Sequence, residues 1–307
     1  MASSTAQRSN PSYKRAVTEP HSFSNGALIE QHLNALRARK FSTNTINRRR
    51  WLLHAVAEYI HPTTLYEATF EELLAWHTSI SHLSAGSVAG YLAHIRTFYG
   101  WLVRPMRYLD VSPAADLALP SVKPTRPRPI PEDDFRRAVL GTVDDLMRTW
   151  LLLMRYAGLR CCEVAWMGRD WVVEDGDPRL VVNGKGAKQR VVFVDGELVD
   201  LLRPWMRTQG RLFLREDGRP VTPAIVSSRT SKHLHGLGLA YTAHQVRHLS
   251  ATDALNRTKN IRLVQEFLGH ASLESTQVYT LVDQPESVQL AHDWGADLRD
   301  LNRRKRG

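Results

Sequence analysis

The stretch His244-Gln245-Val246-Arg247-His248 places a histidine and an arginine three residues apart. Side chains with this spacing lie on one face of a helix, and a helix is predicted over 243–256. From that face His244 and Arg247 can donate hydrogen bonds to two oxygens of one phosphate. His248 is expected to point elsewhere and to be structural. A single His-x-x-Arg pair means little alone, so the neighbouring motifs decide its interpretation.

A second arginine stands upstream in Gly158-Leu159-Arg160-Cys161-Cys162-Glu163. Gly158 is expected to adopt the left-handed conformation that ends a helix, so that Arg160 projects from a rigid corner. Glu163, one turn further on, can hold one edge of the guanidinium and leave the other edge for an anion. A purely structural pair between Arg160 and Glu163 is the alternative.

A β-hairpin is predicted between these motifs. The β-branched runs 179–182 and 190–194 flank the glycine-rich segment 183–188, which is typical of a hairpin turn. Lys185 lies in this turn and can reach an oxygen of a bound phosphate. Lys188 in the same loop is the alternative candidate for this role. The turn does not open a helix, so the Walker pattern of nucleotide-binding proteins is absent.

Two motifs follow near the end of the chain, Leu268-Gly269-His270 and Thr276-Gln277-Val278-Tyr279. Gly269 is expected to close a helix over 261–268, which places His270 just past its end. A last helix is predicted over 272–281, with Tyr279 near enough in sequence to share a site with His270. A tyrosine at helical spacing is, taken alone, more often a core residue.

Together the motifs supply cations to hold a phosphate, a lysine to give a proton and a tyrosine to attack, with no carboxylate or thiol cluster for a metal. In kind and order they resemble the tyrosine recombinases, or phage integrase family, over most of the chain. Cys162 stands where the family often has serine, and Val246 where leucine is usual. The resemblance implies no cofactor, support of Arg160 by Glu163, and these catalytic residues: Arg160, Lys185, His244, Arg247, His270 and the nucleophile Tyr279.

The resemblance also implies a function: site-specific cleavage and rejoining of DNA through a 3′-phosphotyrosyl intermediate, in integration, excision or resolution of a DNA element. The expected partners are double-stranded DNA with an inverted-repeat core site and a homo-tetramer on two such sites. Exchange of the segment after Tyr279 between protomers and an accessory or partner recombinase are further expectations. The alternatives are a catalytically silent DNA-binding regulator on the same fold and a type IB topoisomerase-like enzyme. A small RNA-binding protein would explain the charge but not the motifs.

Composition agrees with a nucleic-acid partner. The 307 residues carry a formal net charge of +10, which favours a polyanion through counterion release. The longest apolar run, 150–154, is bounded by Arg148 and Arg155, so no membrane association is expected. The start of the chain is polar, without an apolar signal region, and the adjacent Cys161 and Cys162 suit neither a disulfide nor a zinc site. A cytoplasmic location is therefore expected.

The predicted fold is mainly α with a small β-hairpin, in two domains. Apolar residues at helical spacing predict four helices before residue 104, and Thr69 with Glu72 predicts a capping box. Six prolines between 113 and 131 mark an extended basic linker. Helices are also predicted over 196–208 and 222–235. The expected divisions are a flexible tail (1–23), a helical core-binding, SAM-like DNA-binding domain (24–110), the linker (111–131), a mixed α/β catalytic domain (132–298) and a basic tail (299–307).

The DNA-contacting residues expected from exposed basic and polar positions lie in the helical domain, the linker and the hairpin turn. They are Lys40, Asn47, Arg48, Arg50, Lys123, Arg126, Arg128 and Lys188.

Overall fold

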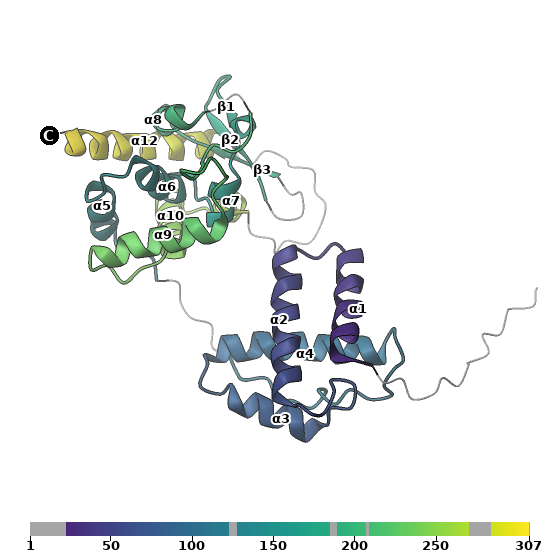
Figure 1. Cartoon of the computed structure of the whole chain (residues 1–307). Coiled ribbons are helices and arrows are strands. Elements are labelled where there is room, and N and C mark those ends of the chain that lie inside the picture. Colours follow the sequence, from purple (N-terminus) through teal and green to yellow (C-terminus); the bar gives the residue numbers. More distant parts are fainter. Residues whose placement is uncertain (1–22, 123–127, 185–188, 207–208, 270–283, 307) are drawn as a thin grey trace, which may run out of the picture. The chain divides into compact units, whose positions relative to one another are not determined.

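The computed structural model describes residues 23–122, 128–184, 189–206, 209–269 and 284–306 (Figure 1). Several predicted residues lie outside this part of the chain, together with the predicted helix 272–281: Lys123, Arg126, Lys185, Lys188, His270 and Tyr279. The chain divides into two compact units, Met1–Pro124 and Thr125–Gly307, and the division falls inside the proline-rich stretch.

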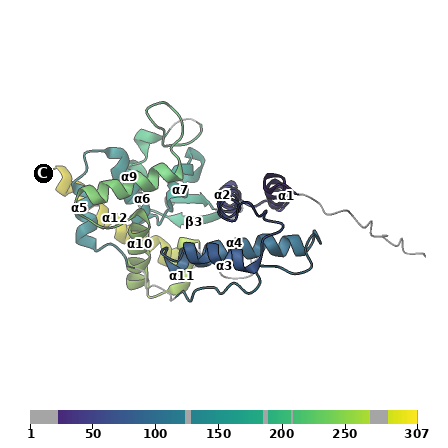
Figure 2. The same ribbon diagram turned by 60° about the horizontal axis from the view of Figure 1, so that its bottom comes forward.

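The described part of the first unit, residues 23–122, contains four helices, as predicted: α1 (Asn25–Ala38), α2 (Thr43–Tyr59), α3 (Phe70–Ser79) and α4 (Ala85–Val103). Each begins at a serine or threonine whose side chain accepts a hydrogen bond from the first turn, and Thr69 with Glu72 forms the predicted capping box. Within this unit α1 and α2 run side by side, and α3 and α4 lie across them (Figures 1 and 2). The apolar faces of the helices form one core.

The linker is shorter than the predicted 111–131. Ala114 and Leu117 are fully buried in the core of the first unit, and Ile130 is fully buried in the core of the second. Apolar side chains at both ends of the proline-rich stretch therefore fold with the unit next to them, because burial removes their surface from water.

The second unit combines helices with a small antiparallel sheet. Its strands are β1 (Val172–Val173), β2 (Arg179–Asn183) and β3 (Gln189–Phe193), in the order β1-β2-β3. Strands β2 and β3 form the predicted hairpin, and Asn183 pairs with Gln189 at the last rung before the turn. Strand β1 was not predicted, because a strand of two residues is too short to show the alternation of buried and exposed side chains.

Helix α6 (Asp145–Tyr156) is buried along most of its length and forms the centre of this unit. Around it lie α5 (Glu132–Leu140), α7 (Cys161–Trp166), the 3₁₀ turn η1 (Arg169–Trp171), α9 (Pro223–Gly236), α10 (Ala243–Thr258) and α11 (Ile261–Leu268). The predicted helices over 222–235, 243–256 and 261–268 are confirmed within about a turn. The helix predicted over 196–208 is wrong: α8 (Gly196–Asp200) ends early and is followed by η2 (Arg203–Trp205). Pro204 cannot donate the backbone hydrogen bond that a continuous helix needs.

Helix α12 (Gln284–Arg306) corrects the boundary expected at residue 298. It runs through that position without a break, and Leu301 beyond it is fully buried in the core of the second unit. Asn302 bonds with Arg148 and, through Nδ2, with Glu197 at 3.1 Å. Residues 299–306 are therefore the end of a packed helix rather than a separate tail. Among the helices described here, none has the length and apolar character to cross a membrane.

Candidate active site

The corner at Gly158 is formed as predicted. Gly158 has φ +58°, and a Cβ placed there would lie 2.7 Å from the ring of Phe267. Only glycine combines that left-handed backbone with so close an approach. The next residues lead into α7, and Arg160 is the residue that precedes its first turn. The close packing against Phe267 therefore fixes where Arg160 leaves the backbone.

Glu163 lies at the centre of the site. It is 1% exposed and accepts hydrogen bonds from Arg160 twice, at 2.8 Å from the backbone N and at 2.8 Å from Nη1. The predicted contact between Arg160 and Glu163 is thus confirmed. Arg160 is still 37% exposed, and its Nη2 donates to the Gly269 carbonyl at 3.1 Å. One edge of this guanidinium is held and the side chain remains open to solvent.

Arg190 is a member of the site that sequence reasoning missed. Its Nη1 and Nη2 donate to the two carboxylate oxygens of Glu163 at 2.7 and 2.8 Å, and its Nε donates to the Phe267 carbonyl at 2.8 Å. It is 7% exposed, at an inward position of β3, where buried and exposed residues alternate. An arginine on the buried face of a predicted strand was the available signal, because such a residue requires a partner.

Arg247 comes from the other side, on α10. It is buried and donates to the carbonyls of Gly158 and Leu268. Its Nη1 also lies 3.6 Å from a carboxylate oxygen of Glu163. Gly269 ends α11 in the left-handed conformation, with φ +63°, as predicted. Three guanidinium groups from separate elements therefore surround one carboxylate.

The electrostatics of this cluster favour an anion. Burial alone would raise the pKa of Glu163, but the hydrogen bonds and charge of Arg190, with help from Arg160 and Arg247, hold that pKa at about 2. Burial and then the charge of Arg160 lower the pKa of Arg247 to about 9, so it stays charged at neutral pH. Arg160, Arg190 and Arg247 against Glu163 leave a net charge of two positives in a mostly buried cluster, which a phosphate would neutralise in part.

The two histidines of α10 lie together, contrary to the expectation for His248. Their ring centroids are 4.3 Å apart in a T-shaped arrangement, because residues four apart share a helix face. His244 is exposed, whereas His248 is partly covered. Burial, followed by the charge of Arg247, lowers the pKa of His248, which keeps it neutral near physiological pH.

The cysteines beside Arg160 are both free and half-buried. Burial raises the pKa of Cys161, with Cys162 adding to the effect, and burial together with Glu163 raises the pKa of Cys162. Both thiols are therefore protonated and unreactive at neutral pH. Within the described part of the chain, no group of three or more His, Cys, Asp or Glu residues is arranged to hold a metal ion.

In the first unit, predicted DNA-contacting residues gather on α2. Arg50 donates to Asn47 at 3.1 Å, as their spacing predicts, and is also held by Glu30 at 2.9 Å. The guanidinium of Arg48 lies over the Tyr91 ring, 5.5 Å from its centroid. The same face of α2 includes Trp51, which is 57% exposed and was not predicted.

The other predicted contacts are scattered. Lys40 is exposed just after α1, in a left-handed conformation with φ +57°. Arg128 is exposed at the start of the second unit, and its carbonyl accepts a hydrogen bond from Gln245 Nε2 at 3.2 Å.

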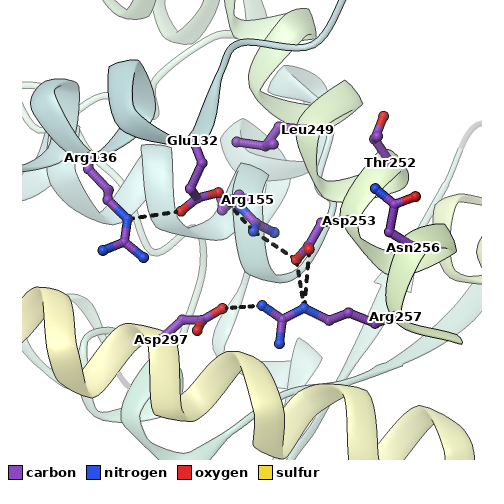
Figure 3. A pocket seen from close by; sticks show the side chains of 9 residues that line it. All are labelled: Glu132, Arg136, Arg155, Leu249, Thr252, Asp253, Asn256, Arg257 and Asp297. Atoms are coloured by element: carbon purple, nitrogen blue, oxygen red, sulfur yellow. Dashed lines mark hydrogen bonds and ion pairs between the residues drawn. The ribbon is translucent and has the colours of Figure 1, made fainter.

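A second charged cluster fixes α12 to its own unit (Figure 3). Arg155, 1% exposed on α6, is 3.1 Å from Glu132 and 2.8 Å from Asp253. Trp294 of α12 donates to Asp253 at 2.7 Å, and Asp297 of α12 is 2.7 Å from Arg257. These contacts, with the burial of α12 apolar residues, hold the helix against α10, α5 and α8.

Comparison with known proteins gives the family. A family model described as the phage integrase family matches residues 137–286. Tyrosine recombinase XerC of Xylella fastidiosa is 34% identical over 213 residues, which are 66% of this chain and 71% of that protein. Tyrosine recombinase XerC 2 of Ralstonia nicotianae is 29% identical over 294 residues, covering 86% of this chain and 84% of that protein. The chain belongs to the phage integrase family of tyrosine recombinases.

Solved structures agree on the fold of this recombinase. A lambda integrase (75–356) dimer bound to a COC′ core site has a TM-score of 0.67 at 15% identity, covering 83% of this chain and 98% of that one. XerH site-specific recombinase bound to its difH substrate has a TM-score of 0.61 at 20% identity, covering 88% and 84%. The predicted fold class is confirmed. The protein is a tyrosine-type site-specific recombinase.

Proposed function

We propose that this recombinase cuts one DNA strand at a time by attack of Tyr279 on a phosphate held by Arg160 and Arg247. The observation that supports these roles is the cluster around Glu163, where three guanidinium groups face one buried carboxylate. Arg160 is the exposed member and can add a phosphate oxygen to its contacts. Charge that develops on the phosphorus oxygens during attack is stabilised by donors already fixed in place.

The reaction conserves the phosphodiester bond energy. The hydroxyl oxygen of Tyr279 gives its proton to solvent water and forms a bond to phosphorus, while the bond from phosphorus to the 5′ oxygen breaks. Lys185, in the turn after Asn183, gives a proton to the leaving 5′ oxygen, and the product is a 3′-phosphotyrosyl link. His244 and His270 donate hydrogen bonds to the phosphate. Attack by the 5′ hydroxyl of a partner strand reverses the step and completes the exchange.

Two features near the site agree with these roles. His270 directly follows Gly269, whose carbonyl accepts a hydrogen bond from Arg160. In the sequence Lys185 lies between Asn183 and Gln189, which pair at the last rung of the hairpin next to Arg190. In the sequence, His270 is therefore next to Gly269 and Lys185 is five positions before Arg190, and both of these neighbours contact the cluster around Glu163.

The DNA site is proposed to be an inverted repeat bound by both units. The first unit presents Asn47, Arg48, Arg50 and Trp51 on α2, where basic groups meet phosphates and an exposed aromatic meets a base or sugar. Lys40 and Arg128, with Lys123, Arg126 and Lys188, complete the proposed basic contacts. An inverted repeat suits two copies of one chain, because the symmetry of the site matches that of the protein pair.

Assembly of four protomers on two sites, with exchange of α12 between neighbours, is proposed as the active state. Lambda integrase has been solved as a tetramer bound to a Holliday junction, with a TM-score of 0.66 and 15% identity to this chain. In the single chain α12 packs on its own unit through Trp294 and Leu298. Exchange would replace these contacts by the same contacts in a neighbour, as in domain swapping. An accessory or partner recombinase would act at this step.

Trapping of covalent adducts tests the proposal. The protein is incubated with a library of random double-stranded DNA fragments, denatured, and the fragments still attached to it are recovered and sequenced. We expect adducts that share one inverted-repeat sequence in the wild type and no adducts for Tyr279→Phe. The proposal is wrong if DNA is bound tightly but neither protein forms an adduct.

A further inference from the structure

Arg190 is a buried cation at the site for which the chemistry above has no use. We propose that Arg190 is a positioning residue for strand cleavage: it takes up the charge of Glu163, so that Arg160 and Arg247 keep theirs for the scissile phosphate. This role rests on the proposed function and deepens it. Arg190 itself does not touch the DNA.

The geometry assigns Glu163 mainly to Arg190. Both carboxylate oxygens are engaged by Arg190, at 2.7 and 2.8 Å, in a bidentate pair. Arg160 binds one carboxylate oxygen with a single guanidinium nitrogen at 2.8 Å and the other with its uncharged backbone N–H at 2.8 Å, and Arg247 is 3.6 Å away. A parallel pair of charge-assisted bonds is the strongest form of this contact, so it dominates the position of the carboxylate.

Each of the three guanidinium nitrogens of Arg190 donates a hydrogen bond inside the protein. Its third nitrogen, Nε, donates to the Phe267 carbonyl at 2.8 Å, and the side chain is 7% exposed. Arg160, in contrast, is 37% exposed. The two arginines that share Glu163 therefore have different tasks, one inside the protein and one at its surface.

The charge count shows what Arg190 contributes. Arg190 cancels the negative charge of Glu163. The net charge of the site is then two positives, which are those of Arg160 and Arg247. Without Arg190 the net charge falls to one. The buried carboxylate would then draw on Arg160 and Arg247 for its compensation and compete with the phosphate for them.

Arg190 also joins three segments that lead to proposed catalytic residues. It stands on β3, one residue after the last rung before the turn that contains Lys185. It bonds to α7 through Glu163 and to the end of α11 through Phe267. A Cβ on Gly269 would lie 3.0 Å from Arg190 Cδ, so the stem of the arginine packs where the chain turns towards His270. Loss of Arg190 would loosen all three segments at once.

The experiment compares strand cleavage in Arg190→Gln with cleavage in the double variant Arg190→Gln/Glu163→Gln. The substrate is a nicked duplex with the sequence recovered in adducts of the wild type, and the readouts are the rate of adduct formation and the affinity for uncut duplex. We expect Arg190→Gln to cleave on the order of 100-fold more slowly, because the oxyanion donors are drawn away. Affinity should change by less than about threefold, because other phosphate contacts dominate binding.

Rescue distinguishes charge compensation from mere structural support. The double variant again has two positive charges at the site, so it should cleave about tenfold faster than Arg190→Gln alone. A double variant as slow as Arg190→Gln, or slower, would overturn the proposal, as would wild-type cleavage by folded Arg190→Gln. If Arg190→Gln does not fold by circular dichroism, Arg190→Lys replaces it. Lysine keeps the charge but not the bidentate contact, so cleavage should still fall several-fold, and an unchanged rate would refute the role.

Two controls keep failure of this proposal separate from failure of the proposed function. Arg179→Gln, on the neighbouring strand, removes an arginine paired with the exposed Asp175 and should leave cleavage unchanged. Arg155→Gln removes another buried arginine, paired with Glu132 and Asp253, and should show no rescue by Glu163→Gln. Absence of adducts in the wild type would refute the proposed function itself, whereas adducts in the wild type without rescue refute only the role of Arg190.

Discussion

Replacement of Glu163 by glutamine should strongly destabilise the second unit, because one carboxylate there offsets three cations. Glu163 is 1% exposed and accepts hydrogen bonds from Arg160 and Arg190. Its surroundings lower its pKa from 4.5 to about 2, which corresponds to about 3 kcal/mol of stability at neutral pH. Loss of one partner of a buried ion pair typically costs a similar amount, about 3–5 kcal/mol. For a unit of this size we expect a fall in melting temperature of roughly 10 °C.

Thermal unfolding followed by circular dichroism measures this effect, with Glu174→Gln as the matched control. Glu174 also pairs with two arginines, Arg169 at 3.5 Å and Arg203 at 3.0 Å, but its side chain is 33% exposed. Loss of such a surface pair should cost no more than about 0.5 kcal/mol. Equal losses of stability in the two variants would refute the argument that burial makes the Glu163 cluster matter.

The pH dependence of the same pair of proteins gives a second check. The folded-state pKa of Glu163 is depressed, so its contribution is fully present above the unfolded value of 4.5 and is lost as pH falls towards 2. The gap in stability between wild type and Glu163→Gln should therefore narrow as pH falls below about 4.5. A gap that stays constant through this range would contradict the assigned pKa shift.

Four further predictions follow from individual residues. Burial, with Arg49 beside it, lowers the pKa of His32 from 6.5 to about 4, so the stability that depends on the neutral imidazole is complete above pH 6.5 and is lost as pH falls towards 4. His32→Gln should therefore remove about 3 kcal/mol of the loss of stability between pH 6.5 and 4, measured by urea unfolding. An unchanged dependence of stability on pH would contradict this prediction. Gly158→Ala should destabilise the protein by more than about 2 kcal/mol in thermal melts, because the added Cβ meets the ring of Phe267. Gly176→Ala, with φ +73° but open space around it, should cost about 1 kcal/mol. Equal costs would show that the contact between residue 158 and Phe267 is unimportant. Lys185→Ala should slow cleavage of ordinary DNA but not of DNA with sulfur at the bridging 5′ position, since a thiolate leaves without a proton; if only Lys188→Ala behaves this way, the general acid is the other lysine. Trp294→Ala should cost about 3–5 kcal/mol in thermal melts because the side chain is 2% exposed, and a loss below about 1 kcal/mol would mean that α12 is not packed on its own unit.

Local features of the sequence predicted the parts of the fold that depend on local physics. The capping box at Thr69 and the left-handed glycines Gly158 and Gly269 at helix ends have signals in the adjacent sequence. The contact between Arg160 and Glu163 was predictable for the same reason, since the two residues are three positions apart on a helical turn.

Contacts between segments that are distant in the sequence could not be predicted from local patterns. Arg190 meets Glu163 across 27 residues and Phe267 across 77, and no local pattern relates these positions. The apolar residues of α12, such as Leu298 and Leu301, have helical spacing, but the basic residues at the end of the chain suggested a tail instead. Their burial depends on the surface that α5, α8 and α10 offer, which exists only in the folded unit.

Identification of the residue that becomes linked to DNA is the decisive test of cleavage by Tyr279. Adducts formed on the recovered target duplex are digested with nuclease and protease, and the peptide that retains a nucleotide is sequenced by mass spectrometry. We expect one modified peptide, with the nucleotide joined through its 3′ phosphate to Tyr279. A nucleotide on Tyr241 or another residue, or attachment through a 5′ phosphate, would contradict it.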